Sequence, residues 1–204
     1  MKKVFAIMAL VAAMFVAGNA QAQISINAGY SPEKFVAKQG NYSESINYQG
    51  FFVGITDNFV LYKGLGVAPG LQFRMNTKSQ SETYLGTTVK TTSQQMLIDV
   101  PILFNYGIAI NDKITITPFA GPMFSLAILG KDTSNAGNSS ITENWYENGN
   151  VNRFNVNLVG GAAVSFNKAK LFAGYRFGLV DMDKNNESLT IKTQGFFVGL
   201  GYTF

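Results

Sequence analysis

The last twelve residues, from Thr193 to Phe204, constrain the fold of this chain most strongly. Side chains on a strand point alternately to the two faces of a sheet, and here the alternation produces one broad apolar face and one small, mostly polar face. The apolar face carries Phe196, Val198, Leu200, Tyr202 and Phe204. A soluble sandwich would bury such a face, whereas a membrane barrel would turn it to lipid and line its lumen with the small residues.

The same alternation returns in seven earlier stretches, so the chain is expected to form eight strands. Most of them are closer to the about 9–11 residues of a tilted membrane strand than to the about 5–6 residues common in soluble proteins. We therefore expect an all-β fold: an eight-stranded antiparallel up-and-down transmembrane β-barrel after an N-terminal signal peptide. The expected strands cover 24–30, 51–56, 67–76, 96–108, 114–128, 154–166, 171–179 and 193–204.

The connections between these strands alternate between short and long. The short ones are 57–64, 111–113 and 167–169, and the long polar ones are 31–48, 77–93, 131–152 and 182–192. In an up-and-down barrel, this alternation places all long loops at one end, and the short turns and both termini at the other. Bacterial outer-membrane barrels have this arrangement, with short turns in the periplasm and long loops outside.

Charged residues are segregated within the expected strands. The apolar faces carry no Lys, Arg, Asp or Glu, and the strand charges Arg74, Asp99 and Arg176 all fall on the opposite faces. A lipid-facing charge at mid-bilayer would cost roughly 2–4 kcal/mol. Because the lumen of an eight-stranded barrel is just wide enough for side chains to fill it, we expect these three residues to form an ion-paired plug. A narrow ion path is the alternative.

The N-terminus is typical of an exported protein. Lys2 and Lys3 precede an apolar run over 4–16, and small residues at 20 and 22 suit a signal peptidase. We expect 1–22 to be a signal peptide, cleaved between Ala22 and Gln23, and 23–204 to be an outer-membrane β-barrel domain. A membrane anchor helix is the alternative, but the apolar run is shorter than the about 20 residues that such a helix needs.

The composition excludes several classes of partner and site. The whole chain has 16 Lys+Arg and 12 Asp+Glu, and loss of the two leader lysines lowers its net charge from +4 to +2. Without a block of basic residues, no nucleic-acid partner is expected. The chain has no cysteine for a disulfide and no histidine for general-base chemistry near neutral pH. We therefore expect neither catalytic residues nor a cofactor.

Three stretches resemble the small outer-membrane β-barrel proteins of the Bacteroidetes group, which are related in shape to OmpX-type barrels. They are the export site at 20–22, the strand MLIDVPILFNYGI at 96–108 and the aromatic-ended strand at 195–204. The resemblance implies an outer-membrane location and contact with outer-membrane lipid. It also implies that Tyr202 and Phe204 belong to a terminal signal read by the barrel assembly machinery. It brings no catalytic residues with it.

Two other features are candidate sites. Trp145 and Tyr146 lie among polar residues in the longest loop, where they either form a contact surface or pack the loop against its neighbours. Asp181, Asp183 and Asn185 match the start of a calcium loop, but the glycine and the final glutamate that such a loop requires are absent. We therefore expect no metal site there.

Two functions from different classes follow from these observations. The first is a structural or interaction role in adhesion, envelope integrity or secretion, through an extracellular or envelope protein partner of the loops. The second is a small pore for ions or small solutes. A third possibility is a periplasmic lipocalin-like barrel, which would bury its apolar faces and expose its charges.

Overall fold

The computed structural model describes residues 23–84, 87–136, 139–147, 149–183 and 189–204. The expected signal peptide, with Ala22, lies outside these residues, and Gln23 begins the first strand. No helix in the described residues is long and apolar enough to cross a membrane. The described strands are β1 (Gln23–Tyr30), β2 (Glu33–Gln39), β3 (Tyr42–Tyr62), β4 (Leu65–Tyr84), β5 (Thr87–Tyr106), β6 (Ile108–Ala109), β7 (Ile114–Ala136), β8 (Ser139–Asn144), β9 (Phe154–Phe166), β10 (Ala169–Gly178) and β11 (Leu189–Thr203).

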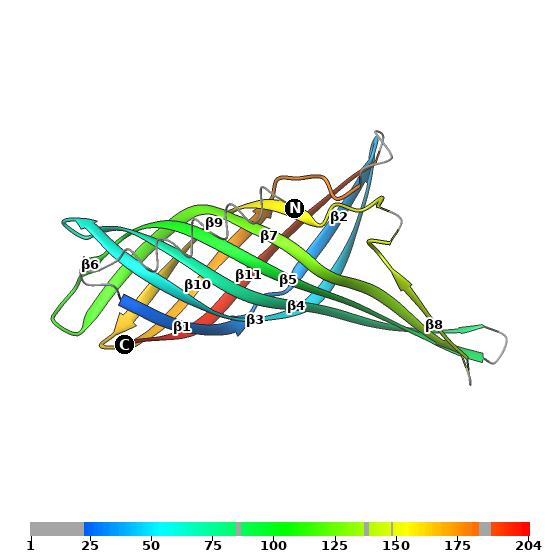
Figure 1. Ribbon diagram of the computed structural model, residues 1–204, viewed down its shortest axis with the longest axis horizontal. Coiled ribbons are helices and arrows are strands. Elements are labelled where there is room, and N and C mark those ends of the chain that lie inside the picture. Colours follow the sequence, from blue (N-terminus) through cyan, green and yellow to red (C-terminus); the bar gives the residue numbers. More distant parts are fainter. Residues whose placement is uncertain (1–22, 85–86, 137–138, 148, 184–188) are drawn as a thin grey trace.

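The strands close on themselves through antiparallel pairing. β1 pairs with β11 on one side and with β3 on the other, so the sheet has no free edge along β1. The closed ring runs through β1, β3, β4, β5, β7, β9, β10, β11 and back to β1. Figure 1 shows these strands tilted around a common axis, with the C-terminus at the end opposite the long hairpins.

The described residues form eleven strands, not the eight that the alternation predicts. Three short strands account for the difference. β2 continues the wall of β1, since it also pairs with β11 and β3, and the two are separated at Ser31 and Pro32, where proline has no N–H for the ladder. β6 follows β5 after Gly107, and β8 pairs only with β7 among the described strands.

The long polar segments are mostly strand, which corrects the expectation that they form loops. β4 and β5 stay paired as far as Tyr84 and Thr87, and β2 and β3 as far as Gln39 and Tyr42. These ends extend well past the barrel wall (Figure 1). Both of their faces meet water, so their Ser and Thr residues lack the apolar alternation that marks a strand in a sequence.

One expected turn is also shorter than predicted. β3 continues to Tyr62, and Tyr62 pairs with Leu65, so the turn consists of Lys63 and Gly64 alone. Both have a positive φ, 42° and 88°, as a two-residue hairpin turn requires.

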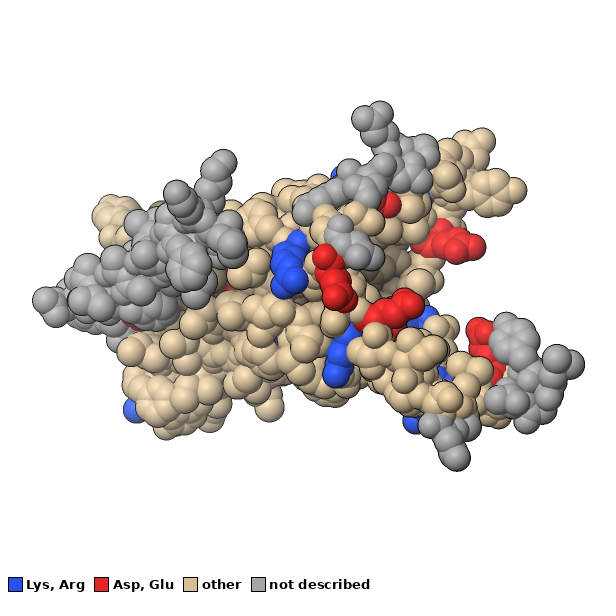
Figure 2. Space-filling view, turned by 45° about the vertical axis from the view of Figure 1, so that its right-hand side comes forward, with Lys and Arg blue, Asp and Glu red and all other residues tan. Residues whose placement is uncertain are grey.

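The burial pattern is the reverse of that in a soluble protein. On β1, Ile26 is 47% exposed and faces outward, whereas Asn27 is 2% exposed and faces the lumen. The same contrast recurs around the ring, where large apolar residues cover the outside and polar residues are buried. In Figure 2, most of the visible charged side chains lie toward the end with the long hairpins. The lipocalin-like alternative, with apolar faces inside, is therefore wrong.

Candidate functional site

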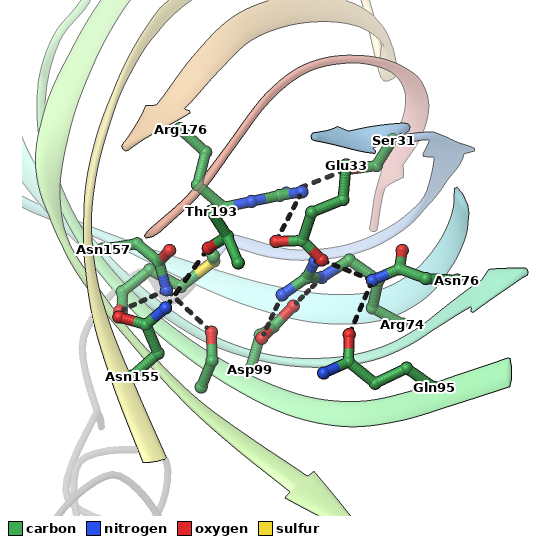
Figure 3. A network of polar contacts seen from close by, with 12 residues as sticks. Ser31, Glu33, Arg74, Asn76, Gln95, Asp99, Asn155, Asn157, Arg176 and Thr193 are labelled. Carbon is green, nitrogen blue, oxygen red and sulfur yellow. Dashed lines mark hydrogen bonds and ion pairs between the residues drawn. The ribbon is translucent and has the colours of Figure 1, made fainter. Parts of the chain in front are cut away.

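A charged cluster crosses the lumen near the level where the long hairpins leave the barrel. Arg74 on β4 holds Asp99 on β5 with two parallel hydrogen bonds, Nε to Oδ2 at 2.7 Å and Nη2 to Oδ1 at 3.2 Å. The remaining nitrogen of Arg74, Nη1, lies 2.5 Å from Oε2 of Glu33 on β2. The two parallel hydrogen bonds between Arg74 and Asp99 form a bidentate ion pair, a geometry that adds both energy and specificity. Arg74 cross-links three strands through buried charges (Figure 3).

Arg176 on β10 joins the cluster from the opposite wall. Its Nη1 donates to the hydroxyl of Ser31 at 2.8 Å, and its Nη2 lies 3.6 Å from Oε1 of Glu33. Glu33 therefore lies between two guanidinium groups, and the cluster balances two arginines with two carboxylates. A balanced set matters because an unpaired buried charge is expensive, whereas a paired one is tolerated.

Amide side chains connect the charged cluster to the loop side of the lumen. Asn76 donates to Glu33 and to Oε1 of Gln95, the latter at 3.1 Å. Gln95 in turn donates to the hydroxyl of Tyr146 at 3.0 Å. The guanidinium of Arg153 lies 4.7 Å from the centre of the Tyr146 ring. The side chains above the cluster are thus held in one continuous polar chain.

The lumen is closed on this side. Tyr146 packs against Leu97 and Ala127 above the charged cluster, with Trp145 against the same group. The space left between this cap and the cluster is about 10 Å³, which is roughly the volume required by one water molecule. The described residues therefore leave no open channel at this level.

On the turn side of the cluster, the lumen is hollow. A cavity of about 550 Å³ reaches from the short turns to Arg74 and Arg176. Phe119 and Phe172 on its wall lie against glycines of neighbouring strands: a Cβ on Gly161 would be 2.7 Å from Cζ of Phe119, and one on Gly199 would be 2.5 Å from Cζ of Phe172. Because glycine leaves room for each ring against the wall, the centre stays open.

A family model for the outer membrane protein beta-barrel domain matches residues 17–184. The chain belongs to this family. It is accordingly a β-barrel protein of the bacterial outer membrane, which agrees with the closed sheet and with the apolar outer surface. A comparison with curated protein sequences found no match.

Several solved structures resemble this outer-membrane barrel at low identity. Ail of Yersinia pestis, in complex with the heparin analogue sucrose octasulfate, is 17% identical over 91% of this chain and 100% of its own, with a TM-score of 0.44. Neisserial surface protein A is 15% identical over 91% and 100%, with a TM-score of 0.43. The outer membrane enzyme PagL is 10% identical over 84% and 98%, with a TM-score of 0.41.

The barrel brings together the three lumen charges that the sequence singled out. Arg74, Asp99 and Arg176 lie in one buried cluster. Its fourth member, Glu33, is not among the predicted site residues, because the sequence pattern predicts a loop over 31–48. One signal could have found it. Two cations and one anion in a closed lumen leave one positive charge unbalanced, and Glu33 is the third residue after the end of β1.

The other predicted residues lie apart from the cluster's charges. Of the two alternatives for the loop aromatics, the structure shows packing: Tyr146 is buried, and the Trp145 ring lies 6.5 Å from that of Phe35 and 6.2 Å from that of Tyr48. Tyr202 and Phe204 are exposed on the outside of the barrel at the turn end, with their ring centres 5.3 Å apart.

Proposed function

We propose that this outer-membrane barrel is a non-catalytic surface protein. The barrel, whose lumen is sealed, anchors long β-hairpins. These hairpins contact an extracellular or envelope protein partner in adhesion, envelope integrity or secretion. The observation that carries the proposal is the sealed lumen: the charged cluster and the Tyr146 cap occupy the section through which a solute would have to pass.

The hairpins supply the contact surface. The outer ends of β4, β5, β7 and β8 pair in that order, so a four-stranded sheet of polar residues continues beyond the barrel. Ile141 on β8 and Tyr42 at the tip of the β2–β3 hairpin are 65% and 84% exposed. Exposed apolar and aromatic side chains among polar ones favour protein contact. The backbone of an edge strand such as β8 offers further hydrogen bonds to a partner.

The absence of catalysis is part of the proposal. The chain has no histidine, and both acids of the lumen cluster are ion-paired with arginine, which leaves neither of them poised as a general base. We also infer, from the stretches 96–108 and 195–204, that the barrel is of the Bacteroidetes type. The outward rings of Tyr202 and Phe204 are available for recognition by the assembly machinery.

Thiol labelling tests the display of the hairpins. The chain has no cysteine, so Ser81→Cys on β4 and Asp112→Cys in the turn before β7 each introduce a unique thiol at an exposed position. With a membrane-impermeant maleimide, we expect Ser81→Cys to react in intact cells. Asp112→Cys should react only after the outer membrane is permeabilised. Equal labelling of both in intact cells, or the reverse order, would contradict the proposal.

A small pore is the second candidate, because the lumen is already hollow on the turn side of the charged cluster. Conductance across a planar lipid bilayer separates the two functions. We expect the purified protein to give no steady ion current. A steady current that changes in Arg74→Met but not in Lys90→Met, where the lysine is exposed on a hairpin, would establish the pore instead.

A further inference from the structure

The apolar outer surface ends in an aromatic rim on the side of the long hairpins. The ring centre of Tyr30 on β1 lies 5.4 Å from that of Phe51 on β3 and 6.0 Å from that of Phe196 on β11, and both contacts are edge-on. The hydroxyl of Tyr30 donates to Oε1 of Gln49. A tyrosine whose ring lies among apolar side chains and whose hydroxyl meets a polar one is typical of the boundary between hydrocarbon and lipid head groups.

Three lysines lie beyond this rim on the outer face of two paired strands. Glu33 of β2 and Thr193 of β11 are buried on the lumen side. Because side chains alternate along a strand, Lys34 and Lys38 of β2 and Lys192 of β11 point to the outside. Figure 1 shows β2 and the outer half of β11 side by side at the end with the long hairpins.

The register brings these lysines close to one another. Lys192 is directly opposite Val36, which lies between Lys34 and Lys38 on β2. Lys192 is therefore a diagonal neighbour of both. Diagonal neighbours on one face of an antiparallel pair are about 7–8 Å apart. The flexible four-carbon stem of lysine covers that distance, so two of these ammonium groups can reach the same anion.

The positive charge of this face is not balanced by an acid. The β3 residues opposite Lys34 and Lys38 are Asn47 and Ser43, which are neutral. Glu44 of β3 is opposite Ala37 and thus belongs to the other face. No carboxylate of the described residues forms an ion pair with any of the three lysines, since the ion pairs found there belong to the lumen cluster.

The depth of the lysines matches that of lipid head groups. Lys34 is opposite Gln194, two residues beyond Phe196 on β11, and Lys192 is four residues beyond Phe196. At about 3.3 Å per residue and a strand tilt of about 40°, Lys34 and Lys192 lie roughly 5 and 10 Å above the rim. The head-group layer extends roughly 5–8 Å from the hydrocarbon core, and lysine side chains bend toward it.

Continuity with the lipid-facing surface indicates what kind of anion binds here. Below the lysines, Phe196, Val198 and Leu200 are exposed on the outside of β11, where they face hydrocarbon. A lipid whose acyl chains lie on this surface places its head group at the lysines. A phosphate has several acceptor oxygens and attracts clustered lysines at a membrane surface. A free anion would make no use of the apolar surface below.

We propose that Lys34 and Lys192, with Lys38 farther out, bind the phosphate of a lipid head group. The acyl chains of the same lipid pack on the outer surface of β11 at Phe196 and Val198. The site lies on the outer wall of the barrel, so it depends neither on the lumen nor on the protein partner proposed for the hairpins.

Native mass spectrometry of the folded barrel in detergent micelles tests the site, with dioleoyl phosphatidic acid as the probe. Its phosphate is anionic and unobstructed, whereas choline neutralises the phosphate of dioleoyl phosphatidylcholine. We expect phosphatidic acid to bind at least about tenfold more tightly than phosphatidylcholine. Lys34→Gln/Lys192→Gln should weaken binding of phosphatidic acid by about tenfold or more, since each lysine near an anionic lipid contributes about fivefold.

The matched control removes the same charge from the β4–β5 hairpin. Lys78 falls on the same side of β4 as Arg74, which faces the lumen, and Lys90 lies on the exposed outer end of β5. Lys78→Gln/Lys90→Gln should leave the binding of phosphatidic acid unchanged. If it weakens binding as much as Lys34→Gln/Lys192→Gln does, the lipid responds only to overall charge and the proposal is wrong.

A conservative variant separates loss of charge from loss of structure. Lys34→Arg/Lys192→Arg keeps both charges and should bind phosphatidic acid within about threefold of the wild type. The electrophoretic mobility of unboiled samples shows that each variant is folded. The proposal is overturned if phosphatidylcholine binds the wild type as tightly as phosphatidic acid, or if folded Lys34→Gln/Lys192→Gln binds phosphatidic acid as the wild type does. It is equally overturned if equimolar inorganic phosphate displaces the lipid, since the site would then be one for a free anion.

Discussion

Arg74→Met is expected to lower the free energy of unfolding by about 3–5 kcal/mol, which is the range for breaking a buried ion pair from one side. Arg74 is fully enclosed and holds both Asp99 and Glu33. Methionine fills a similar length but carries no charge. Glu33 would keep Arg176 as a neighbour at 3.6 Å, whereas Asp99 would lose its bidentate partner.

Urea unfolding in lipid or micelles, followed by the fluorescence of the single tryptophan, measures this loss. Lys90→Met on the exposed end of β5 is the control and should change stability by no more than about 0.5 kcal/mol. The double variant Arg74→Met/Asp99→Asn removes the orphaned charge and should recover much of the loss. If the single variant is as stable as the control, or if the double variant recovers nothing, the cluster does not stabilise the barrel as described.

Val53→Lys is expected to have the second large effect. It should make the free energy of folding in a bilayer less favourable by roughly 2–4 kcal/mol. Val53 is 52% exposed on the outside of β3, where it lies between Ala28 of β1 and Phe73 of β4. In water, a lysine at an exposed site would be harmless. In the hydrocarbon of a membrane, its ammonium must lose hydration or reach for the interface, and both are costly.

The matched control is Thr88→Lys, at an exposed position on the outer end of β5. Folding into liposomes of both variants and of the wild type, measured by the shift in electrophoretic mobility of unboiled samples, gives the comparison. We expect Val53→Lys to insert poorly and Thr88→Lys to insert as the wild type does. Equal insertion of the two variants would show that the outer face of β3 does not meet lipid.

Three features of the structure are not predicted by the sequence, each for a physical reason: Glu33 as a cluster member, the outer ends of β4 and β5, and the cavity. Glu33 was missed because Pro32 interrupts the alternation, so nothing local indicates that the strand resumes. The sequence predicts loops at the outer ends of β4 and β5 because water covers both of their faces, and the period of two disappears when neither face is apolar. The sequence does not predict the cavity, since it depends on rings such as Phe119 lying over glycines of another strand.

The sequence by itself determined which way each side chain of a barrel strand faces. That property is local, because successive residues on a strand point to opposite sides. If the side chain of Ile26 points outward, that of Asn27 must point inward. Only the tertiary structure decided which inward groups meet. Ser31 and Arg176 bond across 145 positions of sequence, and Glu33 reaches both arginines only because β2 pairs with β11 and β3. Such meetings depend on register and closure between distant strands, which the alternation within one strand does not encode.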